Sequence, residues 1–313
     1  MKNDKIWAYL IQLSSNMWGQ PNCMEKRSVY YDELPTDDET WKQVIDFLPG
    51  QGFNTVVIDV GDGIEYESHP EISIKGAWSK QKLKDELDRM RSMGLNPIPK
   101  LNFSTGHDTW LKKYALMVCT PEYYQVCRDV ILEVAELFGQ PDLFHLGMDE
   151  ETAAHQSKFN IVRFRQGEQW WHDLFYFFDS CDMAGVRPWI WSDPVWRKEA
   201  EFVQKMPRSV MQSNWFYGYV DKNPDDTYTT RYCEAFRVLE KAGFDQIPAG
   251  SCWETNCFNA RELMQLGKEE ISPEHLKGQM ACPWFLTQKI DLYNHLNEAW
   301  RFGAALREHY PEG

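Results

Sequence analysis

The chain has 313 residues and a formal net charge of −14, from 47 acidic against 33 basic residues. This length permits one large α/β barrel or two average domains, and the acidic balance argues against nucleic acid as a partner. No stretch approaches the roughly 18 apolar residues of a membrane span and the N-terminus lacks a signal-peptide pattern, so we expect no membrane partner and a cytoplasmic protein, with a processed secreted form left open.

Short apolar runs alternate with helical patterns along the whole chain. The run 54–60 is apolar throughout, as in strands buried on both faces of a parallel sheet. Ser79 and the pair Thr120-Pro121 are typical helix starts, and Gly139 is a typical helix end. The predicted strands lie at or within 6–13, 54–60, 95–101, 143–151, 187–192, 207–215, 244–253 and 277–285. The predicted helices lie at 39–48, 79–93, 120–139, 168–185, 195–204, 229–243, 259–266 and 291–309.

This alternation predicts the α/β class and a single (β/α)8 TIM barrel that spans residues 1–313 as one domain. The sequence contains no linker, low-complexity tract or short-period repeat that would divide the chain. A doubly wound open sheet is the alternative. It would place a glycine-rich phosphate turn after the first strand, where "QLSSNMWGQ" stands instead.

In such a barrel the functional groups lie at the carboxyl ends of the strands. The segments at those ends carry acids, histidines and aromatic residues, and the candidates for substrate contact and catalysis are Asn16, Asp62, His107, His145, Asp149, Glu150, Trp191, Asp193, Trp215, Tyr217, Trp253, Glu254 and Trp284. We see no Cys/His cluster, no serine in a nucleophile elbow and no basic phosphate cradle, so we expect no metal and no cofactor.

The chain contains 14 tryptophans, and carboxylates set among tryptophans suit the cleavage of glycosidic bonds. A carboxylic acid of raised pKa protonates the leaving oxygen, and aromatic rings stack on the apolar faces of sugars. A carbohydrate substrate is therefore the expected partner.

The stretch "LFHLGMDEE" (143–151) holds the strongest candidates. Asp149 and Glu150 follow the predicted fourth strand and are interpreted as pocket residues, although an acidic turn is the plainer alternative. Glu151 is assigned to solvent or to a helix start near Thr152. His145 is interpreted either as a buried core imidazole or as a residue that supports the site.

Four segments taken together resemble glycoside hydrolase family 20, the β-N-acetylhexosaminidases. "FHLGMDEE" is similar to the His-x-Gly-Gly-Asp-Glu motif of that family, with Met148 in place of the second glycine. The other three segments are "HPEISIKGAWS" (69–79), "NPIPKLNFSTGH" (96–107) and "KGQMACPWFLT" (277–287). The similarity lies in order and spacing over roughly residues 40–290, and it indicates a divergent member.

The resemblance implies a retaining, substrate-assisted mechanism without a metal. Glu150 matches the general acid/base, and Asp149 matches the residue that orients the substrate's 2-acetamido group, whose carbonyl oxygen is the nucleophile. Asp62 and His107 match a supporting Asp–His pair near the acid. The residues that fall near the pocket-wall aromatics of the family are Trp191, Trp253 and Trp284.

The departures from the family pattern are equally specific. Ser15 stands where an arginine is expected, Leu286 replaces a glutamate, and Lys100 and Asn102 replace an acidic pair. We also expect the small α+β domain that usually precedes the barrel to be missing. These departures predict altered sugar specificity, or alternatively a non-catalytic carbohydrate-binding barrel. An isomerase or lyase is a third class, with Lys100 as the candidate base.

Overall fold

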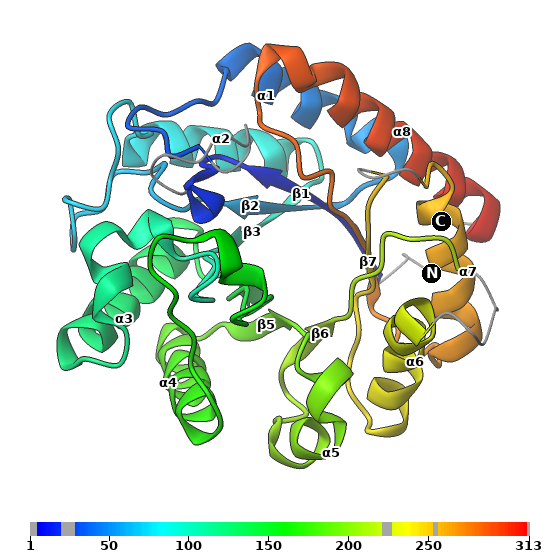
Figure 1. Ribbon diagram of the computed structural model, residues 1–313. Coiled ribbons are helices and arrows are strands. Elements are labelled where there is room, and N and C mark those ends of the chain that lie inside the picture. The colour runs from blue at the N-terminus through cyan, green and yellow to red at the C-terminus, as the bar shows by residue number, and fades with distance from the viewer. Residues whose placement is uncertain (1–4, 20–28, 221–226, 253–255, 312–313) are drawn as a thin grey trace.

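The computed structural model describes residues 5–19, 29–220, 227–252 and 256–311. Within these ranges eight strands pair in parallel in the order β6-β5-β4-β3-β2-β1-β8-β7 and surround a central axis (Figure 1). The strands are β1 (Ile6–Gln12), β2 (Thr55–Asp59), β3 (Asn96–Lys100), β4 (Leu143–His145), β5 (Arg187–Trp191), β6 (Met211–Ser213), β7 (Ala249–Gly250) and β8 (Gly278–Ala281).

The sheet closes between its first and last strands, β6 and β7. Isolated parallel bridges join Gln212 to Gln246 and Trp215 to Ala249. The N–H of Ala249 donates to the carbonyl of Asn214 at 3.0 Å, which continues the ladder beyond β6. The single (β/α)8 barrel predicted from the sequence is therefore confirmed.

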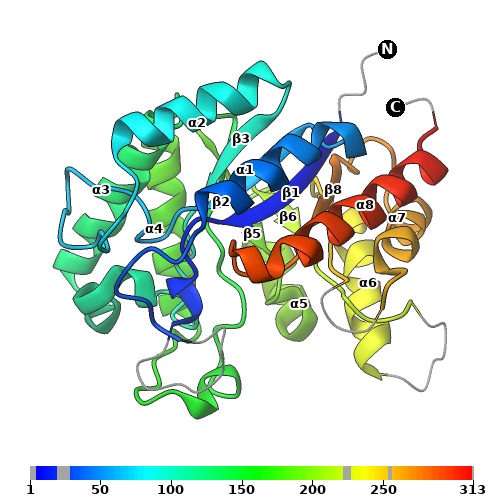
Figure 2. The same ribbon diagram turned by 90° about the horizontal axis from the view of Figure 1, so that it is seen from above.

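Helices follow the strands and cover the barrel from outside, and in Figure 2 helices α1, α2 and α8 lie over β1 and β2. The helices are α1 (Asp38–Phe47), α2 (Lys80–Ser92), α3 (Pro121–Leu137), α4 (Glu168–Ala184), α5 (Val195–Lys205), α6 (Thr227–Lys241), α7 (Asn259–Glu270) and α8 (Leu292–His309). No helix in the described ranges combines the length and apolar character that crossing a membrane requires.

The helix starts follow the capping residues of the sequence. Oγ of Ser79 accepts the N–H of Lys82 at 3.2 Å, and Oγ1 of Thr120 accepts the N–H of Tyr123 at 3.2 Å. Pro121 occupies the first position of α3, where a missing N–H is tolerated. These predicted starts are confirmed because each cap satisfies an amide that the helix itself leaves free.

The composition of β3 explains why β4 is short. Every residue of β2 is buried, and β2 pairs with all five residues of β3. Toward β4, β3 pairs only through Lys100 and His145. The N–H of Leu101 faces β4 and donates to the carbonyl of His145. Alternate residues of a strand face the same neighbour, so Pro97 and Pro99 also face β4, and proline has no N–H to donate there. The chain after β4 is thus released early to form the turn that carries Asp149 and Glu150.

Candidate active site

The chain turns sharply after β4. Gly147, Met148 and Glu150 have positive φ angles of 71°, 77° and 53°. Glycine is required at the first of these positions, because a Cβ on Gly147 would lie 2.0 Å from Oδ1 of Asn102. Met148 stands where the family motif has its second glycine, so the backbone keeps a conformation suited to glycine although the side chain differs. Strain of this kind in non-glycine residues is concentrated at functional sites.

Asn102, just beyond β3, holds this turn in place. Its Oδ1 accepts the N–H of Ser104 at 3.1 Å and that of Met148 at 3.2 Å. Its Nδ2 donates to Oδ1 of Asp149 at 2.7 Å. Asn102 is buried, whereas the Asp149 side chain is 13% exposed. One buried amide therefore fixes both the backbone of the turn and the orientation of the Asp149 carboxylate.

Two imidazoles face the acid pair. Nε2 of His107 lies 3.2 Å from Oε2 of Glu150 and 3.3 Å from Oδ2 of Asp149. His155 belongs to the short helix η5 (His155–Lys158), and its Nδ1 lies 3.2 Å from the same oxygen of Glu150. The centroids of the two imidazole rings are 5.0 Å apart. The loops after β3 and β4 thus bring two carboxylates and two histidines to one point.

The charges in this cluster shift one another. Burial alone lowers the pKa of His107, but the carboxylates of Asp149 and Glu150 outweigh burial and raise this pKa overall. Burial raises the pKa of Glu150, but the hydrogen bond from His107 and the positive charges of His107, His155 and Arg197 bring this pKa below its ordinary value. Burial and the charge of His107 lower the pKa of His155. The arrangement favours an ionised Glu150 and stabilises the protonated form of His107 beside it.

Asp193 supplies a third carboxyl group from the loop after β5. Its Oδ2 accepts the N–H of Glu150 at 2.9 Å, and its Oδ1 accepts Nε1–H of Trp215 at 2.8 Å. Burial and the negative charges of Asp149 and Glu150 outweigh these hydrogen bonds and raise the pKa of Asp193 well above its ordinary value. The structure therefore favours a neutral Asp193 that positions Glu150 through its backbone.

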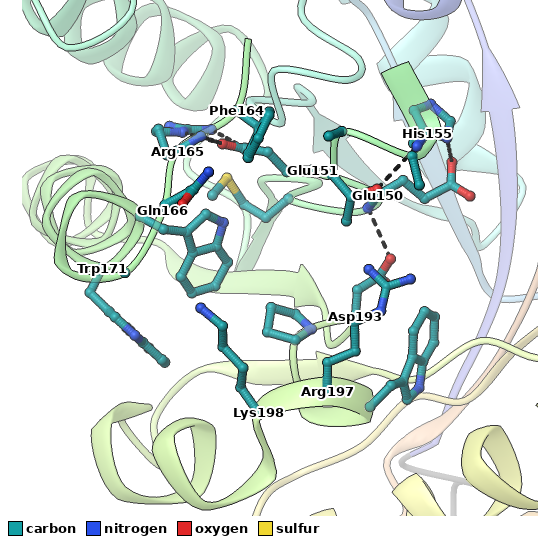
Figure 3. A pocket seen from close by; sticks show the side chains of 18 of the residues that line it. Glu150, Glu151, His155, Phe164, Arg165, Gln166, Trp171, Asp193, Arg197 and Lys198 are labelled. Carbon is teal, nitrogen blue, oxygen red and sulfur yellow. Dashed lines mark hydrogen bonds and ion pairs between the residues drawn. The ribbon is translucent and has the colours of Figure 1, made fainter. Parts of the chain in front are cut away.

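A cavity of about 560 Å³ opens beside Glu150, between the loop after β4 and the start of α5 (Figure 3). Glu150 and Asp193 lie at one end, and Trp171 and Lys198 lie at the other. Further residues of its lining include His155, Arg165, Gln166, Trp170, Trp196, Arg197 and Trp215. Its size and mixed aromatic and polar wall are typical of a small-molecule site. Asp149 is not among the described residues that line it, so the cavity extends from Glu150 away from Asp149.

The third acid of the run, Glu151, also lines this cavity but is held by different partners. The Glu151 side chain is 3% exposed, and Arg165 binds both of its oxygens, through Nε at 2.8 Å and Nη2 at 2.6 Å. Arg165 also contacts Asp173 of α4 at 3.1 Å. The expectation that Glu151 would lie in solvent or at a helix start is wrong, because a two-point guanidinium contact holds it in the interior.

Four of the predicted aromatic residues, those within the described ranges, form one connected cluster. The rings of Trp191 and Trp284 are 6.0 Å apart, and Trp284 Nε1 donates to the hydroxyl of Tyr217 at 2.9 Å. Tyr217 stacks on Trp215 with ring centroids 5.0 Å apart. Trp191 is 1% exposed, so it packs beneath the site and offers no open ring face. Trp215 and Tyr217 are only partly covered and keep part of their ring surface exposed.

Asp62 and Asn16 do not reach the acid pair. Asp62 accepts hydrogen bonds from Ser14 and, at 2.9 Å, from Nδ2 of Asn16, and both Asp62 and Asn16 are fully buried. Burial raises the pKa of Asp62 to about 6. Nδ1 of His107 has no hydrogen-bond partner among the described residues. The implied Asp62–His107 pair is therefore not formed, and Asp62 and Asn16 instead stabilise the loops after β2 and β1.

His145 and Lys100 are also interior residues. His145 has no exposed surface and lies against the rings of Trp189 and Trp191, and burial lowers its pKa well below the ordinary value. Its Nδ1 accepts the N–H of Gly147 at 3.0 Å, so it supports the turn from the interior. Lys100 is fully buried in an ion pair with Asp59. This burial removes Lys100 as a candidate base.

Two predicted residues, Trp253 and Glu254, lie outside the described residues. Other residues at the site escaped prediction or were given no role. Asn102 appears in the sequence only as a departure from the family motif, and its hold on Asp149 depends on tertiary contact. His155 follows Glu150 by five residues in "EETAAH". This short separation from a candidate acid is the sequence feature that could have identified His155 as a site residue. Arg197 and Lys198 line the cavity, and no local sequence pattern predicts that position.

Comparison with known proteins finds matches to solved structures and no match by sequence. No model of a known protein family matches the chain, and no curated protein matches it. The fold, by contrast, matches many solved structures. The chain thus resembles known proteins in fold and not in sequence. The departures from the family motif at Ser15, Met148 and Leu286 agree with this result.

Three of these structures are β-N-acetylhexosaminidases. The family 20 enzyme of Streptomyces coelicolor A3(2) is 13% identical with a TM-score of 0.63, over 96% of this chain and 64% of that one. The Streptomyces plicatus enzyme in complex with Thio-NAglucal is 14% identical, with a TM-score of 0.61 and the same coverage. For the Bacteroides fragilis NCTC 9343 enzyme the identity is 14%, the TM-score 0.58 and the coverage 94% and 65%. The chain spans less than two thirds of each of these proteins, and it has, in divergent form, the barrel fold of the glycoside hydrolase family 20 hexosaminidases.

Proposed function

We propose that the protein is a retaining glycoside hydrolase of the β-N-acetylhexosaminidase type with altered sugar specificity. The observation that carries this proposal is the acid pair itself. Asp149 and Glu150 lie at the carboxyl end of β4, held by Asn102 and faced by His107, on the fold that hexosaminidases use. Neither carboxylate is neutralised by a guanidinium or ammonium contact in the described residues, in contrast to Glu151.

Asp149 has the role of orienting the substrate in this proposal. Its Oδ1 is occupied by the Asn102 amide, and its Oδ2 lies near Nε2 of His107. A carboxylate held from two sides keeps its remaining lone pairs in fixed directions, which suits it to accept the N–H of a 2-acetamido group. That contact would turn the acetamido carbonyl oxygen toward the anomeric carbon, which it attacks.

Glu150 supplies the proton to the leaving oxygen. Its pKa is lowered in the free protein, which is opposite to the shift that a general acid needs. His107 resolves this difficulty, because its pKa is raised and its Nε2 lies 3.2 Å from Oε2 of Glu150. A bound sugar would displace water from Glu150, whose side chain is 36% exposed, and desolvation favours the neutral acid. The proton then passes from His107 to Glu150 and on to the glycosidic oxygen.

The leaving group occupies the cavity beside Glu150. This cavity begins at the carboxylate that must reach the glycosidic oxygen and extends away from Asp149, where the reacting sugar binds. Trp215 supplies a partly exposed ring within it, and Lys198 supplies a cation at the far end. A lining of this kind suits a sugar or another polar leaving group with an apolar face.

The sugar differs from a terminal N-acetylhexosamine held in the usual way. Ser15 and Leu286 replace an arginine and a glutamate of the family pattern, and both are buried. Neither can supply a charged contact to sugar hydroxyls, and the loss of charge-assisted hydrogen bonds typically amounts to several kcal/mol. We therefore expect weak activity on simple hexosaminides and higher activity on a substrate that uses other contacts.

A non-catalytic carbohydrate-binding barrel is the second candidate. The lowered pKa of Glu150 and the buried residues at positions 15 and 286 favour it, because binding alone needs neither a proton donor nor the hydroxyl contacts of the family. The two candidates differ in whether any glycosidic bond is broken, so turnover decides between them.

The test compares aryl glycosides that carry a 2-acetamido group with their 2-hydroxy counterparts, each with a good and a poor leaving group. Glu150→Gln should lower the rate most for the poor leaving group, which depends on protonation. Glu136→Gln, the same change at an exposed position of α3, is the matched control. A Glu150→Gln variant that keeps most of its rate on the poor leaving group would overturn the acid assignment. Equal rates on 2-acetamido and 2-hydroxy substrates would overturn substrate assistance.

A further inference from the structure

Three groups at the site converge in a way that hydrolysis alone does not require. His107, Glu150 and His155 each offer one ligand atom, and these three atoms lie within 4.8 Å of one another. They come from three positions in the loops after β3 and β4. Two imidazole nitrogens and one carboxylate oxygen are a ligand set that proteins use for zinc and for other divalent first-row transition metals.

Two of the distances among these atoms lie at the upper end of the hydrogen-bond range. Glu150 Oε2 lies 3.2 Å from His107 Nε2 and 3.2 Å from His155 Nδ1. A charge-assisted N–H···O contact is normally about 2.7–2.9 Å long. Ligand atoms on a tetrahedral zinc ion at bond lengths of 2.0–2.1 Å are instead about 3.3–3.4 Å apart. Both distances are therefore also close to the separation of neighbouring ligands on one ion.

The contacts around these imidazoles are crowded. Nε2 of His107 can donate at most one proton, yet oxygens of both Asp149 and Glu150 lie within 3.3 Å of it. Oε2 of Glu150 in turn meets two imidazole nitrogens. A single cation among His107, Glu150 and His155 would take the place of the two protons that the contacts to Glu150 need.

The site is also accessible. Glu150 and His155 both line the cavity of about 560 Å³, which gives an ion a path from solvent and leaves a coordination position open on that side. Imidazole ligands favour zinc and its neighbours over magnesium and calcium, which prefer oxygen-only sites. We propose that His107, Glu150 and His155 form a binding site for a divalent transition-metal ion such as Zn²⁺, and that occupancy of this site stops hydrolysis.

The second half of this proposal rests on the proposed function. An ion bound to Oε2 of Glu150 occupies the atom that carries the proton to the leaving oxygen. It also holds His107, from which that proton comes. The metal thus competes directly with proton donation, and the metal-free protein is the active form.

Binding is measured first, without substrate. Protein stripped with a chelator is titrated with Zn²⁺ by calorimetry and with Co²⁺ by visible absorption, in which a site of low coordination number gives intense bands. We expect one equivalent per chain and a weaker response to Mg²⁺ by about 100-fold or more. Binding of Mg²⁺ or Ca²⁺ as tight as that of Zn²⁺ would overturn the ligand assignment.

Variants locate the ion. His155→Asn and Glu150→Gln each remove one ligand and should weaken Zn²⁺ binding by about 100-fold or more, since even partners beyond the ligands contribute 10–100-fold. His172→Asn, at an exposed histidine of α4, is the matched control and should bind like the parent. Melting curves without metal show whether each variant folds. If His155→Asn does not fold, Zn²⁺ binding by Glu150→Gln tests the ligand assignment instead. Unchanged binding in a folded ligand variant would contradict the proposal.

Inhibition is measured separately with the best aryl glycoside. Zn²⁺ should abolish turnover by the parent at one equivalent, and whatever activity His155→Asn has should resist the same concentration. Turnover that Zn²⁺ does not affect, despite stoichiometric binding, would refute the inhibitory role. Absence of turnover from the metal-free protein on every glycoside would refute the proposed function instead, while the titrations would still decide the metal site.

Discussion

Glu150 and Glu151 are neighbours in the sequence and both line the cavity, yet their carboxylates differ in exposure and in partners. Glu150 is 36% exposed, lines the cavity and faces two imidazoles. Glu151 is 3% exposed and is bound at both oxygens by Arg165, which also contacts Asp173.

This contrast shows how one acidic run serves two purposes. A carboxylate paired with a permanent guanidinium charge stays ionised and anchors the loop, but it cannot exchange a proton near neutral pH. A carboxylate beside imidazoles can exchange a proton, because histidine titrates close to neutrality. The loop after β4 thus combines a fixed ion pair that holds it with a titratable pair that can act on a substrate.

The largest effect is expected when Glu150 and Glu151 are exchanged for glutamine one at a time. Glu150→Gln should lower kcat/KM on a poor leaving group about a thousandfold, or roughly 4 kcal/mol in the barrier, with unfolding free energy changed by less than about 1 kcal/mol. Glu151→Gln should show the reverse pattern, a large loss of stability with smaller loss of activity per folded molecule. Steady-state kinetics and urea denaturation on both variants measure this, and equal patterns in the two would break the comparison.

Arg165→Met tests the fixed ion pair itself. It leaves Glu151 and Asp173 buried without their cation, and breaking a buried pair in this way typically destabilises a protein by about 3–5 kcal/mol. Arg261→Met is the matched control, because its ion pair with Glu308 is exposed and should contribute at most about 1 kcal/mol. Denaturant midpoints of the two variants give the difference. Similar losses in both would mean that burial adds nothing to the pair at Arg165.

The sequence predicted the parts of the molecule that depend on local pattern. Strand and helix positions follow hydrophobic periodicity, and the caps at Ser79 and Thr120 follow from side chains that bond their own helix. The barrel followed from the repetition of these units. Helix α5, where the pattern is least regular, formed as predicted with a kink at Lys198.

The site was predictable in its types of residue and less so in its contacts. Asp149, Glu150 and His107 come together as the family resemblance implied. The partners of Asp62 and Glu151 were assigned wrongly, because each carboxylate is bound by a residue whose proximity only the folded loops create. A sequence motif shows that an acid is present, but the nearest cation or amide, which sets its chemistry, depends on tertiary packing.

Glu298 on α8 shows what burial does to an acid that no guanidinium holds. It is 2% exposed and accepts the N–H of Cys252, and burial raises its pKa from 4.5 to about 7. The folded state therefore prefers the protonated acid, so the stability linked to Glu298 is complete below about pH 4.5 and is lost as pH rises through 7. Relative to Glu298→Gln, the parent should lose up to roughly 3 kcal/mol of unfolding free energy between pH 5 and 8. Parallel pH profiles for parent and variant would contradict this.

Gly147→Ala gives a smaller effect, and it tests whether the turn after β4 matters through its backbone or through Asn102. The added Cβ meets a positive φ of 71° and Oδ1 of Asn102 at 2.0 Å. Gly185, after α4, has the same φ of 71° with nothing within 4 Å, so Gly185→Ala measures backbone strain alone, about 1 kcal/mol. We expect Gly147→Ala to lose about 2 kcal/mol and also to lower activity, because Asn102 must move and Asp149 loses its donor. If the two variants lose the same stability and neither loses activity, the Asn102 contact does not position Asp149, and the orientation of the acid pair must come from the histidines alone.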